Sequence, residues 1–285
     1  MRQDVLVTLH RAARALAPPL RPLKPVLRPF QRAGRRVFDR LVALRYARAG
    51  VITAEQNGRL WRLDPEVALR GPLQEFETIL WLRQVTKPAM TVIDVGANVG
   101  QMSLEFGELV GKRGRVIAIE PAAGNVRVLR KHIVANGLDD RIEVVEAACA
   151  ETHGGSATFV VLGDDTNAVG SGHAITARAT PELQAHPVTV PRVSVDGLCA
   201  ERNLVPGVVK IDVEGAEIQV LEGAARTLRT ARPMLRIGFH PFAFPDVEAA
   251  STRLRGLLLE HGYRFDGPAS GPLELTEYVA SPADG

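Results

Sequence analysis

The stretch TVIDVGANVG at residues 91–100 decides the fold of this chain. Its first five residues form a β-branched run that predicts a buried strand, and Gly96 and Gly100 predict a sharp turn after it. Apolar residues then recur at helical spacing as far as Leu109. A strand, a glycine turn and a helix in this order open a β-α-β unit, so the sequence predicts a parallel sheet.

Strands and helices continue to alternate along the chain. Because β-α-β units place helices on both faces of a parallel sheet, we predict an α/β fold of this kind. A helix at 73–86 is expected just before the first strand, and a polar loop at 164–173 interrupts the less regular middle. The other predicted strands are 115–119, 142–146, 157–162, 188–195, 208–213, 234–239 and an antiparallel pair at 263–265 and 273–279.

The first fifty residues differ in composition from the rest. They contain twelve Lys or Arg residues and two acids, whereas the remainder carries more acids than bases. A proline cluster at 18–29 separates two short runs with helical periodicity, which predicts two basic helices around an extended linker. We therefore divide the chain into a basic N-terminal extension at 1–50, an edge segment with a covering helix at 51–90, and a main domain at 91–285.

The role of the basic extension stays open at the level of sequence. It could contact an anionic membrane surface, bind nucleic-acid phosphates, or pack on its own domain or on a second subunit of a homo-oligomer. We expect no specific nucleic-acid recognition.

The composition of the whole chain bears on its location. No run of 18 uncharged apolar residues occurs, and two cysteines are too few for a disulfide framework. The expected location is the cytoplasm, with peripheral membrane contact through 1–50 as an option.

The residues around the first glycine turn indicate the charge of the ligand. Asp94 precedes the turn, and a carboxylate there would repel a pyrophosphate but attract a cation. The spacing G-x-N-x-G differs from the dinucleotide pattern G-x-G-x-x-G, and no phosphate-binding G-x-x-x-x-G-K-[ST] occurs. S-Adenosylmethionine fits these features because it carries a sulfonium and an ammonium group and no phosphate.

Two further positions fit a nucleoside. Glu120 ends the second strand about twenty residues after the glycine turn, where an acid can accept hydrogen bonds from both ribose hydroxyls. The alternative for Glu120 is a helix cap or a surface acid. After the third strand, Ala147 and Ala148 would offer small side chains and backbone N–H groups to an adenine edge.

These motifs resemble those of the FkbM-type S-adenosylmethionine-dependent methyltransferases. The resemblance rests on VIDVGANVG, AIEP and above all VVKIDVEGAE at 208–217, and it extends over roughly residues 74–266. It implies a seven-stranded, mostly parallel class I methyltransferase sheet of the Rossmann-like kind. It also implies methyl transfer to hydroxyl oxygens of sugars, polyketides and related metabolites. The implied cofactor contacts are Asp94, Gly96, Asn98, Gly100 and Glu120.

Three residues are candidates for the base that removes the hydroxyl proton. Asp212 ends the fourth core strand and is followed by Glu214, and His240 ends the next strand. A general base contributes about 10²–10⁴-fold to such a reaction. The two acids could instead stabilise a helix N-terminus, and His240 could bond only to backbone. A divalent metal held by Asp212, Glu214 and His240 is an alternative, since oxygen ligands suit Mg²⁺. We predict no metal site, because no ligand spacing in the sequence requires one.

One departure from the family leaves two functions open. The family commonly has an acid two residues before this histidine, where the chain has Gly238. The first function is an O-methyltransferase acting on a hydroxyl of a small molecule, sugar or glycan. The second is a catalytically silent protein that binds the cofactor and uses its basic arm for membrane, nucleic-acid or protein contact. A nucleic-acid base methyltransferase is disfavoured, because the [DN]-P-P-[YFW] element is missing after the fourth strand.

Overall fold

The computed structural model describes residues 4–5, 7–8, 50–70, 76–162, 169–170 and 185–283. The chain divides into two compact units, each described here by itself. The smaller comprises Met1–Glu77 and Val134–Gly137, and the larger comprises Thr78–Ile133 and Leu138–Gly285. The predicted basic helices of the extension fall almost entirely outside the described residues.

The smaller unit contains a β-hairpin. Strands β1 (Ile52–Gln56) and β2 (Arg59–Leu63) pair antiparallel, and helix α3 (Pro65–Arg70) follows. Asn57 and Gly58 connect the strands with φ values of 53° and 79°. An Asn-Gly pair with both φ angles positive gives the tight turn whose twist matches that of the flanking strands.

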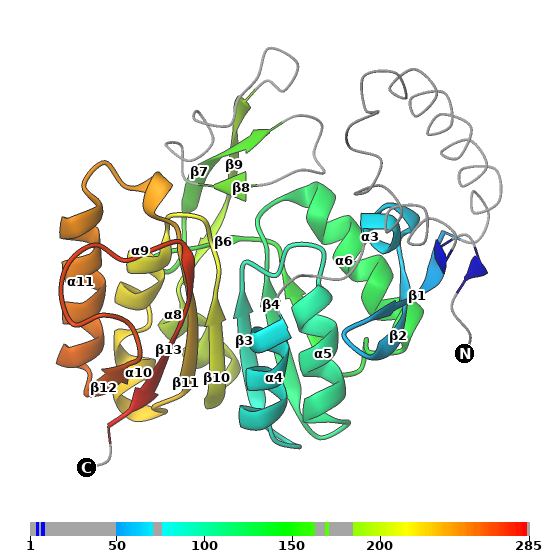
Figure 1. The fold of residues 1–285 in the computed structure, drawn as a ribbon, viewed down its shortest axis with the longest axis horizontal. Helices are drawn as coiled ribbons and strands as arrows, with labels where there is room; N and C mark the ends of the chain where they lie inside the picture. Colours follow the sequence, from blue (N-terminus) through cyan, green and yellow to red (C-terminus); the bar gives the residue numbers. More distant parts are fainter. Residues whose placement is uncertain are drawn as a thin grey trace, which may run out of the picture. The chain divides into compact units, whose positions relative to one another are not determined.

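The larger unit is built on a seven-stranded sheet (Figure 1). Its strand order is β12-β13-β11-β10-β3-β4-β5, in which β13 runs antiparallel to both neighbours and all other pairs are parallel. This confirms the predicted class I methyltransferase fold. The strands are β3 (Thr91–Val95), β4 (Arg115–Ile119), β5 (Ile142–Val145), β10 (Pro206–Ile211), β11 (Met234–Phe239), β12 (Tyr263–Phe265) and β13 (Thr276–Pro282).

Helices bury both faces of this sheet. Ile93 and Val95 of β3 belong to an apolar core shared with the helices α8–α11, while Val92 and Asp94 face the other side and are also buried. Burial of alternate residues on both faces is typical of a covered parallel sheet. The helices are α4 (Phe76–Val85), α5 (Gln101–Val110), α6 (Ala123–Asn136), α8 (Val195–Arg202), α9 (Glu217–Glu222), α10 (Ala225–Thr230), α11 (Val247–Glu260) and the 3₁₀ turn η2 (Pro241–Ala243).

A second sheet has the order β6-β9-β7-β8. Its strands are β6 (Ala148–Cys149), β7 (Ser156–Leu162), β8 (Val169–Gly170) and β9 (Ala185–Val193). In Figure 1, β7 and β9 extend beyond the end of the main sheet at which the loops following β3 and β10 lie. The predicted loop at 164–173 is therefore partly wrong, because residues 169–170 pair with β7; its other residues lie outside the described part of the chain.

Two predicted elements end or break earlier than expected. The fourth core strand stops at Ile211. Ile218, Leu221, Ala225 and Leu228, whose spacing in the sequence predicts one helix, are divided between α9 and α10 at Gly223. A Cβ on Gly223 would overlap the carbonyl oxygen of Ala150, so the break lets two backbones approach closely.

Among the described residues, no helix is both long enough and apolar enough to cross a bilayer.

Candidate active site

A cavity of about 300 Å³ opens at the carboxyl ends of the central strands. The strand ends and turns of β3, β4 and β10, with the start of α9, form about half of its wall, and the segment after β5 with strands β6 and β7 forms the other half. Ligands of open α/β sheets bind at this edge. The lining residues are Val95, Gly96, Ile119, Pro121, Ala147–Glu151, Ala157–Phe159, Val213, Gly215, Ala216 and Gln219.

The glycine turn after β3 lies directly against the turn after β10. Gly96 has a φ of 80°, and a Cβ there would overlap the carbonyl oxygen of Asp212. The backbone N–H of Asp212 in turn donates to the carbonyl of Val95 at 3.0 Å. Gly96 lines the cavity, and its contact with a cofactor stays a prediction. Gly100 packs against Leu129 of α6 and lies outside the cavity lining.

Glu120 ties the glycine turn to helix α6. Its buried carboxylate accepts hydrogen bonds from the backbone N–H of Asn98 at 2.8 Å, the backbone N–H of Ala122 at 3.0 Å and the side-chain amide of Asn125 at 3.1 Å. Burial raises the pKa of Glu120, and these hydrogen bonds oppose the shift. The structure thus shows that Glu120 links the turns after β3 and β4, at the rim formed by Ile119 and Pro121. Ribose contact by Glu120 and cofactor contact by Asn98 stay predictions.

Asp94 lies under the turn instead of on the cavity wall. It is fully buried, and the hydroxyl of Ser103 on α5 donates to its Oδ2 at 2.6 Å. Its Oδ1 has no hydrogen-bond partner among the described residues. Burial raises the pKa of Asp94, partly countered by the charge of Lys210, which is paired with it in register on β10. Direct contact between Asp94 and a cationic ligand, as expected from sequence, would require this carboxylate to turn away from α5.

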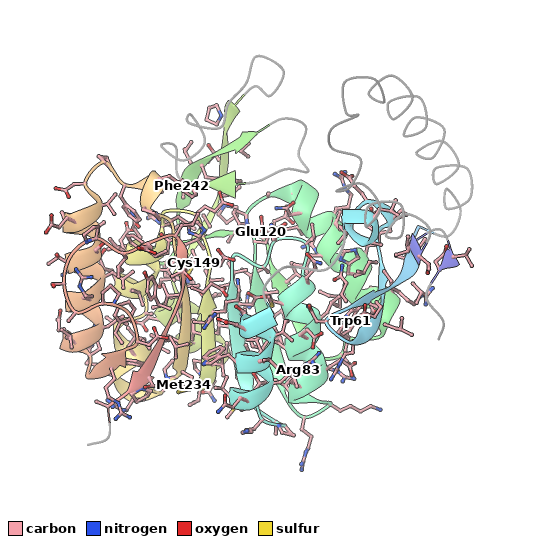
Figure 2. The ribbon with its side chains drawn as sticks, in the orientation of Figure 1. Trp61, Arg83, Glu120, Cys149, Met234 and Phe242 are labelled. Carbon is pink, nitrogen blue, oxygen red and sulfur yellow. The ribbon has the colours of Figure 1, made fainter. Side chains whose placement is uncertain are left out.

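Two alanines follow β5, and their predicted contact with an adenine edge stays a prediction. Ala147 and Ala148 both line the cavity, next to Cys149 (labelled with Glu120 in Figure 2). Burial raises the pKa of the Cys149 thiol to about 12, so this side chain is a buried apolar neighbour of the cavity and no nucleophile.

His240 lies between two carboxylates. Its Nδ1 is 2.7 Å from Oε1 of Glu217, and its Nε2 is 3.5 Å from Oδ1 of Asp212. Phe242, labelled in Figure 2, meets the imidazole edge-on, with ring centroids 5.5 Å apart. Burial lowers the pKa of His240, but the hydrogen bond to Glu217 and the charges of Glu217, Asp212 and Glu214 outweigh it and raise the pKa above its ordinary value.

A buried lysine controls the charge of Asp212. Lys210 donates from Nζ to Oδ2 of Asp212 at 2.9 Å, and it is 2% exposed. Burial works against the charge of Asp212, yet the Lys210 ammonium holds the pKa of this carboxyl below its usual value. Asp212 is therefore a weak proton acceptor, and His240 is the strongest base of the candidate residues whose pKa direction is known.

Glu217 also belongs to this cluster, although the sequence analysis does not name it as a candidate. Its Oε1 accepts from the backbone N–H of Gly215 at 3.0 Å as well as contacting His240, and the side chain is fully buried. Glu214, in the preceding turn, has a φ of 49° and adds its charge to the same cluster. A signal was available, because position 217 has the same helical phase as the buried Val220 and Leu221.

The family acid that this chain lacks would point into the same cluster. A Cβ on Gly238 would lie 3.1 Å from Oδ1 of Asp212 and 3.3 Å from Cε1 of His240. The departure from the family pattern therefore lies inside the site.

Among the described residues, no group of three His, Cys, Asp or Glu side chains is arranged to hold a metal ion.

A second cavity of about 460 Å³ adjoins the first and shares Pro121 and Phe159 with it. Its wall combines the start of α6 with β7 and β9 and is mostly apolar. The remaining lining residues are Ala122, Ala123, Glu146 and Val188–Pro191.

The chain was compared with known proteins. Among solved structures, one similar to it is the methyltransferase FkbM from Methylobacillus flagellatus, with 17% identity and a TM-score of 0.41, covering 72% of this chain and 51% of that chain. Another is a SAM-dependent O-methyltransferase from Thermotoga maritima, with 12% identity and a TM-score of 0.43, covering 75% and 67%. No curated protein sequence gives a match.

The family assignment rests on a sequence match. Residues 94–265, more than half of the chain, match the family described as the methyltransferase FkbM domain. The match includes the glycine turn, the Asp212–Glu217 element and His240. The chain therefore belongs to the FkbM family of S-adenosylmethionine-dependent methyltransferases, as its motifs predicted, and is a methyltransferase.

Proposed function

We propose that this methyltransferase transfers a methyl group to a hydroxyl oxygen of a small molecule, sugar or glycan. The observation that carries the proposal is the position of His240. It lies beside the turn that lines the cavity, with Nδ1 bonded to Glu217 and Nε2 3.5 Å from Asp212. An imidazole oriented in this way can accept a proton from a hydroxyl group.

The cavity at the strand ends suits a cationic nucleoside. None of the described residues that line it is Lys or Arg, so its described wall offers no side-chain cation to a phosphate. Gly96 and Gly215 bring backbone to the wall without a side chain, and Ala147 and Ala148 leave room for a flat base. S-Adenosylmethionine would lie here with its adenine toward the alanines. Glu120 would need to keep one lone pair for the ribose.

The residues around His240 would then complete the reaction. The bound donor supplies a methyl group on a positively charged sulfur. As the acceptor oxygen bonds to the methyl carbon, the carbon–sulfur bond breaks, and Nε2 of His240 takes the hydroxyl proton. Asp212, kept ionised by Lys210, stabilises the imidazolium that forms. Proton removal of this kind contributes about 10²–10⁴-fold.

The test uses donor with an isotopically labelled methyl group, incubated with a metabolite extract and the full-length protein. We expect labelled methyl ethers from the wild type, none from His240→Gln, and equal binding of the demethylated product S-adenosylhomocysteine by both in calorimetry. Label found only on nitrogen or carbon would contradict O-methylation. Binding without transfer to any acceptor would favour the catalytically silent alternative.

The extension at 1–50 supplies no observation for either function, because it lies almost entirely outside the described residues. Peripheral membrane contact through its twelve basic side chains stays a proposal. Co-sedimentation of the full chain with anionic vesicles, lost on deletion of residues 1–50, would support it. Equal sedimentation of both proteins would contradict it.

A further inference from the structure

Glu217 is an acid with no assigned role in a place where an acid is costly. It is the first residue of α9, is fully buried, and its Oε2 has no hydrogen-bond partner among the described residues. Burying a carboxylate is unfavourable unless its charge is compensated. The group that faces its other oxygen is the imidazole of His240, at 2.7 Å.

The contact between Oε1 of Glu217 and Nδ1 of His240 bears on which ring nitrogen carries the proton. A neutral histidine has one N–H donor and one nitrogen lone pair. An ionised carboxylate only accepts hydrogen bonds, so a neutral His240 paired with an ionised Glu217 at 2.7 Å carries its proton on Nδ1 and its lone pair on Nε2, which lies 3.5 Å from Asp212. The Gly215 N–H bond holds the same oxygen from the other side, at 3.0 Å.

In the described part of the chain, the charged groups that face His240 come from two elements. Asp212 and Glu214 belong to the turn after β10, and Glu217 belongs to α9. The opposing cation, Lys210, is bonded to Asp212. The described neighbour from η2, Phe242, carries no charge. Of the three acids, Glu217 makes the short, direct contact with the ring.

We propose that Glu217 is the positioning residue of the base: it holds the Nδ1 proton of His240, which makes Nε2 the proton-accepting atom. Through Gly215 it also joins the base to the turn that lines the donor cavity. The inference rests on the proposed O-methyl transfer. In that step the acceptor O–H bond breaks and an Nε2–H bond forms, while the O–CH₃ bond forms and the carbon–sulfur electron pair returns to sulfur.

The decisive experiment is an NMR titration of the His240 ring in the full chain, which needs no acceptor. His240→Gln identifies the signal among the seven histidines. Glu217→Gln keeps the shape and can still accept both hydrogen bonds, but it removes the charge. We expect its His240 titration midpoint to shift to lower pH, because an adjacent negative charge favours the imidazolium. Glu222→Gln is the matched control on the same helix, since Glu222 bonds to Arg253 instead, and we expect no shift there.

Rates separate positioning from a structural role. With the labelled-donor assay, Glu217→Ala should lower the rate by about 10- to 100-fold while S-adenosylhomocysteine affinity stays within about threefold, and Glu217→Gln should recover part of that loss. An unchanged His240 midpoint in Glu217→Gln would overturn the inference, as would equal rate loss in both variants at every pH. A shifted midpoint in a protein that methylates no hydroxyl would retain the pairing and refute the proposed function instead.

Discussion

Titratable side chains follow two pairs of strands in the main sheet, and their surroundings differ. One set follows β3 and β4, and the other follows β10 and β11. At the first pair, Asp94 and Glu120 are buried, and donors of the turn and of neighbouring helices bind them. At the second pair, Asp212 and His240 face each other and are partly exposed. The first region uses acids to hold a turn in shape, whereas the second leaves a base able to exchange a proton. Substitutions that break one region while sparing the other test this division.

The largest expected effect is that of Gly96→Ala. The new Cβ would overlap the carbonyl of Asp212, and a positive φ is itself unfavourable for alanine by about 1–2 kcal/mol. We expect loss of S-adenosylhomocysteine binding in calorimetry and a marked fall in Tm. Gly111→Ala is the control, because Gly111 also has a positive φ, 64°, but nothing lies within 4 Å of its Cβ position. Retained binding in Gly96→Ala would show that the close turn is not needed.

Lys210→Met should be the next most damaging. Lys210 is buried and lies next to Asp94 and Arg236 in register, with Asp212 bonded to its Nζ. Removing one partner of a buried ion pair costs about 3–5 kcal/mol. We expect that loss in urea unfolding, together with a rise in the pKa of Asp212. Lys112→Met, at an exposed position, should change stability by less than about 0.5 kcal/mol. Equal stability of the two variants would contradict a structural charge network under the site.

The pH dependence of stability should distinguish His240. Because its pKa is raised in the folded state, protonated His240 adds stability at pH values below the ordinary histidine pKa. This stability is lost as the pH rises through the folded-state pKa. We expect chemical unfolding of the wild type to show that loss, and His240→Gln to lack it. If the free energy of unfolding depends on pH in the same way for both proteins, the charges of Glu217 and Asp212 do not raise the pKa of His240.

The smallest expected effect is that of Gly238→Ala. Its Cβ would come 3.1 Å from Oδ1 of Asp212, so Asp212 should move slightly away from His240. We expect a rate reduced by about 3- to 10-fold with unchanged donor affinity. Gly256→Ala on α11, with no neighbour within 4 Å, should leave the rate unchanged. A rate increase in Gly238→Ala would contradict this expectation. It would indicate that a side chain at position 238, where the family commonly has an acid, helps the reaction.

The sheet could be predicted from the sequence, and so could the location of the site at the carboxyl ends of its strands. The run at 91–100 fixes a strand, a glycine turn and a helix by local rules, and the motif at 208–217 identifies the family. The direction of Asp94 could also have been inferred. Ile93 and Val95 are apolar and face one side of the sheet, so Asp94 must face the other, toward α5.

The pairing of side chains at the site could not be predicted. Glu217 and His240 belong to α9 and the end of β11, and their contact depends on how the turn at 212–216 folds against Gly96. The buried bond between Lys210 and Asp212 likewise follows from the early end of β10 at Ile211. Local patterns place residues on elements, but only packing decides which charges meet.

The most direct test of the account is the pH dependence of the methyl-transfer rate at saturating donor, measured beside the NMR titration of His240. The account expects the rate to rise with pH through a single ionisation whose midpoint coincides with that of His240 and shifts with it in Glu217→Gln. A rate that does not change with pH around the His240 midpoint would contradict the assignment of His240 as the base. A rate that falls as the imidazole loses its proton would also contradict it.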